Sequence, residues 1–139
     1  NIYQESIKKH LDYYLTLGSN KSLVLLKEVS DPERFGVPRF NKNKEIVEII
    51  EKPGILNNLP VPSNFAVTGT YMFDSNVFKI IDNLKPSSRG ELEITDVNNQ
   101  YIASSNLEYS IIDGWWRDVG KVEILPEVSR LVFDTYKFD

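Results

Sequence analysis

Cysteine is absent from this 139-residue sequence, and histidine occurs only once. Without cysteine the chain can form neither a disulfide nor a thiolate nucleophile. Zinc would have to be bound by His10 together with carboxylates, because its usual ligands are Cys, His, Asp and Glu. We predict that His10 is a solvated residue on the polar side of the first helix, since no partner residues complete a catalytic triad around it. Thiol chemistry and disulfide frameworks are therefore excluded.

Long apolar runs and basic runs are also missing. No secretory leader pattern and no run of about 18 apolar residues occurs, so we expect a cytoplasmic protein with no membrane partner. The formal net charge is -4, the pI is near 5.1, and Lys and Arg are dispersed, which argues against a nucleic-acid partner. The length and the 41% hydrophobic content predict a single domain over residues 1–139, which buries roughly two-thirds of its unfolded surface.

Apolar periodicity predicts alternating strands and helices, and hence an α/β fold with a mixed sheet. The continuous run Leu23-Val24-Leu25-Leu26 is typical of a buried parallel strand, and the polar turn 41–44 predicts a hairpin. Gly69 lies inside an apolar stretch, where a glycine marks a bulge or a close backbone approach. We expect helices over residues 3–17, 74–84, 91–103 and 121–135, strands over 22–29, 37–41, 45–51, 65–73 and 107–112, and loops over 31–36 and 114–120.

Two charged motifs follow predicted strands. Glu51-Lys52-Pro53 ends the hairpin, where a carboxylate can accept hydrogen bonds from sugar hydroxyls and an ammonium can reach a phosphate. The alternative is a solvated ion pair. Asp118 lies in a loop rich in Gly and Trp and could be a hard oxygen ligand for Mg²⁺, which typically takes one or two carboxylates plus substrate phosphates. The alternative is that Asp118 caps the next helix or braces the turn.

Arg89 precedes the helix that we expect to begin near Glu91. A guanidinium in that position could join the free amide groups of the helix start in holding a phosphate. The alternative is a surface arginine that pairs with Glu91 or Glu93. The sequence leaves both interpretations open.

Four motifs occur in a fixed order along the chain: Asp31-Pro32-Glu33-Arg34-Phe35-Gly36, Glu51-Lys52-Pro53, Arg89-Gly90-Glu91-Leu92-Glu93-Ile94-Thr95-Asp96 and Trp115-Trp116-Arg117-Asp118-Val119-Gly120. Together they resemble the sugar-phosphate-binding half of the sugar-1-phosphate nucleotidylyltransferases, most closely the long-form glucose-1-phosphate thymidylyltransferase type. The resemblance extends from residue 1 to about residue 133. It implies the C-terminal portion of a Rossmann-like α/β nucleotidyltransferase fold with a mixed sheet.

The resemblance also implies roles for individual residues. Lys52, Arg89 and Asp118 would be the catalytic residues, with Asp118 as a ligand of Mg²⁺. Phe35 stands where relatives can carry tyrosine, so a hydroxyl contact is lost there. The sugar or its phosphate would be bound by Asn1, Gly36, Glu51, Lys52, Val67, Thr68, Gly69, Arg89 and Trp116.

The implied reaction transfers a nucleotidyl group from a nucleoside triphosphate, here dTTP, to a sugar 1-phosphate, here glucose 1-phosphate. Two parts that the family carries have no counterpart in the sequence: the Gly-rich nucleotide-binding loop, and the aspartate of a Gly-Asp-Asn motif that would be the second magnesium ligand. We therefore expect the chain to be part of a larger enzyme, inactive alone and able to form homo-oligomers. Two alternatives stay open: a non-catalytic sugar-phosphate-binding or oligomerisation module, and a uridylyltransferase that uses UTP.

Overall fold

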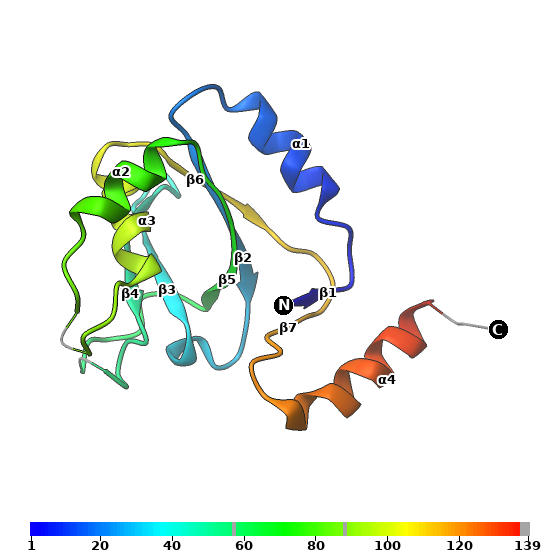
Figure 1. Cartoon of the computed structure of the whole chain (residues 1–139). Coiled ribbons are helices and arrows are strands. Elements are labelled where there is room, and N and C mark those ends of the chain that lie inside the picture. The colour runs from blue at the N-terminus through cyan, green and yellow to red at the C-terminus, as the bar shows by residue number, and fades with distance from the viewer. Residues whose placement is uncertain (57, 88, 137–139) are drawn as a thin grey trace.

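The computed structural model describes residues 1–56, 58–87 and 89–136, and it has an α/β architecture (Figure 1). No helix among these residues is both long and apolar enough to cross a membrane. In chain order the elements are β1 Ile2–Tyr3, α1 Lys8–Thr16, β2 Ser22–Glu28, the 3₁₀ turn η1 Pro32–Arg34, β3 Gly36–Phe40, β4 Ile46–Glu51, β5 Phe65–Met72, α2 Asn76–Asn83, α3 Ile94–Ala103, β6 Leu107–Ile111, β7 Trp116–Arg117, the 3₁₀ turn η2 Val122–Ile124 and α4 Leu125–Tyr136.

The central sheet has the strand order β5-β2-β6, with β2 antiparallel to β5 and parallel to β6. Strand β2 is buried on both faces, as the sequence predicts. Leu23 and Leu25 pack toward α1, while Val24 and Leu26 pack toward β4 on the opposite face. The mixed sheet and the α/β class are thus confirmed, with α1 on one side of the sheet and α2 and α3 on the other (Figure 1).

Strands β3 and β4 form the predicted antiparallel hairpin. The Oδ1 atom of Asn41 accepts hydrogen bonds from the backbone N–H groups of Asn43 (2.9 Å) and Glu45 (3.0 Å), which closes the turn. The register places Gly36, at the start of β3, opposite Glu51, at the end of β4. The hairpin therefore brings together two segments that the sequence analysis assigns to the site.

Gly69 sits at a bulge in β5, which confirms that prediction. The β2–β5 register shifts between the pairs Val24↔Tyr71 and Leu26↔Val67, and Gly69 has a φ of +75°. A Cβ atom at this position would lie 3.0 Å from the Nδ2 atom of Asn1. Glycine is needed both for the left-handed backbone and for this close approach.

Two predicted boundaries are wrong. The first helix begins at Lys8 instead of residue 3, because residues 2–3 form β1 and pair with β7 inside the predicted loop 114–120. The third helix begins at Ile94 instead of residue 91, so Arg89 lies farther from its first turn than predicted. Pro126 is the second residue of α4, and a proline is tolerated in a first helical turn.

His10 is buried, contrary to the prediction of a solvated side chain, and is only 1% exposed. Its Nδ1 atom lies 2.7 Å from the hydroxyl of Ser110, and its Nε2 atom lies 3.2 Å from Glu5. Partial burial would raise the pKa of Glu5. Hydrogen bonds from Lys9, from the Asp113 amide and from His10 outweigh that effect and hold this pKa below its ordinary value. His10 therefore joins α1 to the end of β6.

His10→Ala is expected to lower the free energy of unfolding by roughly 2–4 kcal/mol, because it leaves a cavity and removes a buried hydrogen bond. Urea denaturation of the full-length protein measures this. Lys8→Ala is the matched control, since the Lys8 side chain is 74% exposed and its loss should cost less than about 0.5 kcal/mol. Equal small losses in both variants would contradict the buried placement of His10.

Candidate active site

A hollow of about 200 Å³ lies where the start of β3, the end of β4, β5, the start of α3 and the loop after β7 meet. Five residues proposed from the sequence line it: Gly36, Glu51, Lys52, Val67 and Asp118. Its other lining residues are Arg34, Phe35, Tyr71, Ile94 and Thr95. The fold thus gathers residues from four separate sequence motifs around one small cavity.

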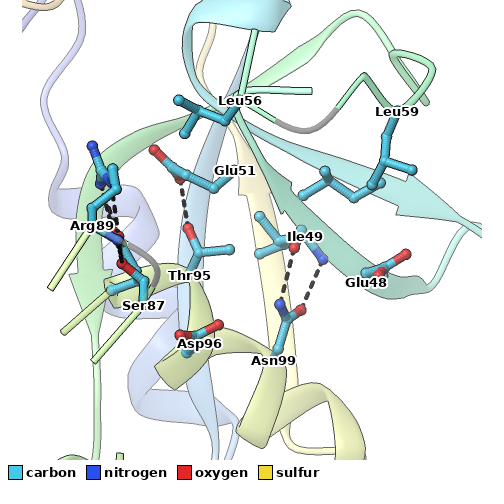
Figure 2. Close-up of a pocket in the computed structure, with 12 residues that line it drawn as sticks. Glu48, Ile49, Glu51, Leu56, Leu59, Ser87, Arg89, Thr95, Asp96 and Asn99 are labelled. Carbon is cyan, nitrogen blue, oxygen red and sulfur yellow. Dashed lines mark hydrogen bonds and ion pairs between the residues drawn. The ribbon is translucent and has the colours of Figure 1, made fainter. Parts of the chain in front are cut away.

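Glu51 is fixed by a hydrogen bond from α3 and faces Gly36 across the hairpin. Its Oε2 atom accepts a 2.7 Å hydrogen bond from the Thr95 hydroxyl at the start of α3 (Figure 2). Across the hairpin, a Cβ atom at Gly36 would lie 3.4 Å from the same Oε2 atom and 3.3 Å from the Cγ2 atom of Ile49. Glycine at position 36 therefore leaves room for the carboxylate and for any group that it binds.

Lys52 has a φ of +42°, in the left-handed region that a non-glycine residue seldom adopts. Its N–H donates to the Phe35 carbonyl (2.9 Å), and its carbonyl accepts from the N–H groups of Ile55 and Leu56 (3.2 and 3.1 Å). Such a conformation costs about 1–3 kcal/mol and persists where the surroundings enforce it. The turn places the ammonium 3.7 Å from Glu51 Oε1, so both side chains line the same hollow.

Arg89 lies in an adjoining pocket of about 360 Å³ that shares Glu51 and Thr95 with the hollow (Figure 2). Its guanidinium makes contacts of 2.8–3.1 Å with Glu93 and one of 3.3 Å with Glu91. These are the surface pairs that the sequence analysis gave as the alternative to phosphate binding. The hydrogen bonds to Glu93 raise the pKa of Arg89.

Glu93 is itself fixed by a second donor. The Ser87 hydroxyl donates to its Oε1 atom at 2.7 Å. This hydrogen bond, followed by those from Arg89, lowers the pKa of Glu93 below the ordinary value for glutamate. The carboxylate therefore stays charged at neutral pH and holds Arg89 beside Glu51.

Asn1, Trp116 and Gly69 form a second group of proposed residues. Trp116 Nε1 donates to Asn1 Oδ1 at 3.1 Å, and Asn1 Nδ2 packs against Gly69. Trp116 is 5% exposed, and its ring meets that of Phe35 edge-on with centroids 5.2 Å apart. Through Phe35 this group adjoins the hollow.

Thr68 does not belong to the lining of the hollow. It is 1% exposed, and its hydroxyl donates to the Leu25 carbonyl at 3.0 Å. The Tyr3 hydroxyl in turn donates to Thr68 Oγ1 at 3.3 Å. The Thr68 side chain therefore braces β5 against β2 and β1.

The Asp118 carboxylate faces the hollow, and within residues 1–56, 58–87 and 89–136 it has no hydrogen-bond or ion-pair partner. The same part of the chain contains no cluster of three or more His, Asp or Glu side chains suited to a metal ion. A free carboxylate is a hard oxygen donor, so Asp118 fits the role of one ligand to Mg²⁺. The remaining ligands would have to be substrate phosphates, water or groups outside the described residues.

Sequence reasoning missed Thr95 and Tyr71 as residues of this site. Thr95 belongs to the Arg89–Asp96 motif, but only the α3–β4 packing shows that its hydroxyl reaches Glu51. Burial, followed by the nearby Glu51 and Tyr3, raises the pKa of Tyr71 to about 12. The Tyr71 hydroxyl therefore remains protonated at neutral pH and can act as a hydrogen-bond donor in the hollow.

Thr95→Val is expected to weaken the binding of any ligand held by Glu51 by about tenfold, because the carboxylate loses its hydrogen bond while side-chain size is kept. Calorimetric titration of the full-length protein with glucose 1-phosphate, the ligand that the motif resemblance implies, measures the change. Thr16→Val is the control, since the Thr16 hydroxyl donates to the Tyr13 carbonyl at the exposed end of α1. Unchanged affinity in Thr95→Val would show that Glu51 needs no fixed orientation.

Comparison with known proteins places the chain in a family. A model of the nucleotidyl transferase family matches residues 1–135. The chain belongs to the nucleotidyl transferase family.

Individual relatives agree with this assignment. The chain is 42% identical over 111 residues to a glucose-1-phosphate thymidylyltransferase from Neisseria meningitidis, a match that covers 78% of this chain and 37% of the relative. It is 36% identical over 112 residues to the low-salt glycan biosynthesis nucleotidyltransferase Agl11 of Haloferax volcanii, covering 80% and 30%. The chain thus spans about a third of the length of these relatives.

Solved structures give the same fold. A Bacillus anthracis protein assigned as a glucose-1-phosphate thymidylyltransferase, in complex with a sucrose, superposes with a TM-score of 0.82 at 42% identity. That match covers 96% of this chain and 51% of the other. An apo UDP-glucose pyrophosphorylase superposes with a TM-score of 0.77 at 28% identity, covering 92% and 47%. The nucleotidyltransferase fold is therefore confirmed.

Proposed function

We propose that the protein containing this chain transfers a nucleotidyl group from dTTP to glucose 1-phosphate and releases pyrophosphate. The 42% identity to thymidylyltransferases supports the choice of both substrates. In this reaction an oxygen of the sugar phosphate attacks the α-phosphorus of the triphosphate, and the bond to the pyrophosphate oxygen breaks. The proposal concerns the full-length protein, and residues 1–139 alone are expected to release no pyrophosphate, because they contain no Gly-rich triphosphate loop.

The observation that carries the proposal is the hollow shared by Glu51, Lys52 and Asp118. Glu51, fixed by Thr95, would accept hydrogen bonds from sugar hydroxyls above Gly36. Lys52 would hold the phosphate as a point charge, with the strained turn setting its direction. Val67, Gly69, Asn1 and Trp116 would complete the wall around the sugar, with Thr68 supporting it from behind.

Arg89 would supply a second cation to the phosphate. Its pocket adjoins the hollow through Glu51 and Thr95, so a phosphate held by Lys52 would come within reach of the Arg89 guanidinium. Because Glu93 already occupies the guanidinium fork, phosphate binding would share or replace those hydrogen bonds. Lys52 and Arg89 would together orient the attacking oxygen.

Asp118 would hold Mg²⁺ as one ligand of its shell. When bound there, the ion would supply positive charge that offsets the charge of the substrate phosphates. The chain's own residues would bind and orient the sugar phosphate and balance its charge. This role explains why the proposed site consists of Lys, Arg, Glu and Asp and needs no activated nucleophile.

Pyrophosphate release by the full-length protein with glucose 1-phosphate and either dTTP or UTP tests the proposal. We expect a higher kcat/KM with dTTP. The second candidate is a uridylyltransferase, favoured by the likeness to UDP-glucose pyrophosphorylases at 28% identity. Preference for UTP would select that candidate. Sugar-phosphate binding without turnover on any triphosphate would leave a non-catalytic binding module.

A further inference from the structure

The side-chain amide of Asn99 bonds to both backbone groups of one residue in β4. Its Oδ1 atom accepts from the Ile49 N–H at 2.9 Å, and its Nδ2 atom donates to the Ile49 carbonyl at 2.9 Å (Figure 2). Asn99 lies on α3 and is half-buried. A side chain that meets a donor and an acceptor of the same residue reproduces what a neighbouring strand would offer.

Strand β4 needs such a partner on this side. It pairs only with β3 among the described residues, and Ile49 lies opposite Pro38, which has no N–H. The Ile49 N–H and carbonyl point away from β3, toward α3. Unpaired backbone groups at a strand edge are costly when partly buried, and Asn99 satisfies both of them.

Asn99 and Thr95 together set the position of α3 along β4. They lie one turn apart on the helix, and their partners Ile49 and Glu51 lie two residues apart on the strand. Four helical residues rise about 6 Å and two strand residues about 6.6 Å, so the two spacings match. One contact fixes the Glu51 carboxylate, and the other fixes the backbone that carries it.

We infer that Asn99 is a positioning residue, which holds the end of β4 so that Glu51 and Lys52 are presented to the sugar phosphate. The inference rests on the proposed function. Asn99 lines the pocket that contains Arg89 but not the hollow itself, so it acts through Ile49 and Glu51. Nothing in the sequence motifs marks this residue, because its role depends on the packing of α3 against the strand.

Asn99→Asp in the full-length protein is the test. The aspartate has nearly the same shape and can still accept from the Ile49 N–H, but its second oxygen would face the Ile49 carbonyl without a proton to donate. We expect KM for glucose 1-phosphate to rise about fivefold to tenfold, with KM for dTTP within about twofold of the unchanged protein. Gln100→Glu is the matched control, since Gln100 is exposed on the same helix and gains the same charge.

A double-mutant cycle with Glu51→Gln separates positioning from stability. If Asn99 acts through Glu51, the increase in KM caused by Asn99→Asp should largely vanish in the Glu51→Gln background. Two results would overturn the inference and leave the proposed function standing. One is that the increases in KM for glucose 1-phosphate caused by the two substitutions multiply in the double variant. The other is that Asn99→Asp lowers the melting temperature but leaves both KM values unchanged. If Glu51→Gln itself leaves KM for glucose 1-phosphate unchanged, the proposed function fails, and the inference fails with it.

Discussion

Asp118→Asn in the full-length protein is expected to lower kcat at least about a hundredfold, because the charge stabilisation supplied by a bound metal is worth several kcal/mol. Asparagine keeps the size of the side chain but removes the charge that Asp118 directs into the hollow. The melting temperature should change little, since no described residue forms a hydrogen bond or ion pair with this carboxylate. Pyrophosphate release measured over a range of Mg²⁺ concentrations reports the loss.

Asp82→Asn is the control for this experiment. Asp82 is exposed near the end of α2 and does not line the hollow, so the same chemical change should leave kcat unaltered. Near-normal turnover of Asp118→Asn at limiting Mg²⁺ would mean that Asp118 braces the turn toward α4. The metal would then be held elsewhere.

Arg89→Ala is expected to weaken glucose 1-phosphate binding by roughly 10- to 100-fold, since a hydrogen bond to a charged group is worth about 1.5–3 kcal/mol. Binding of dTTP alone should change little. Arg89→Lys should recover only part of the loss, because an ammonium cannot reproduce the two-pronged guanidinium contact. Calorimetric titration with each ligand separately distinguishes these results.

Arg130→Ala provides the comparison for Arg89→Ala. The Arg130 side chain is 85% exposed on α4 and does not line the hollow, so its removal subtracts one positive charge without changing the lining. If Arg89→Ala weakens the binding of both ligands equally, or does not weaken the binding of the sugar phosphate, Arg89 only forms ion pairs with Glu91 and Glu93 and does not bind the phosphate.

The sequence predicts a segment correctly where the residues of that segment alone decide its structure. The run Leu23-Val24-Leu25-Leu26 is apolar on both sides, and β2 is buried on both faces. The Asn41 turn closes a hairpin through the side chain of Asn41 itself. The glycine in β5 marks a true bulge, because only a residue free to adopt a positive φ fits there.

Features that depend on distant partners could not be predicted in this way. Tyr3 continues a helical apolar pattern, yet Ile2 and Tyr3 form a strand because β7 offers them a pairing partner. His10 has charged neighbours in sequence, but Ser110 and Glu5 enclose it in the fold. The spacing of apolar residues indicates which face of a helix or strand is buried, but it does not indicate which other element packs against that face.

The site shows the same division. The motifs predicted site roles for Glu51, Lys52 and Asp118, and the fold brings these three residues to one hollow. The Glu93 hydrogen bonds that hold Arg89 were foreseen only as an alternative. The contacts of Thr95 and Asn99 with β4 were missed, since they arise from a helix and a strand whose spacing matches only after they pack.

The most direct test of the proposed site is a crystal structure of the full-length protein with glucose 1-phosphate bound. We expect the sugar hydroxyls to contact Glu51, and the phosphate to contact Lys52 and the Arg89 guanidinium. The sugar should lie above Gly36 in the hollow that Asp118 borders. A sugar phosphate bound elsewhere, for example in the separate pocket lined by Lys21 and Lys44, with the hollow empty, would contradict the account.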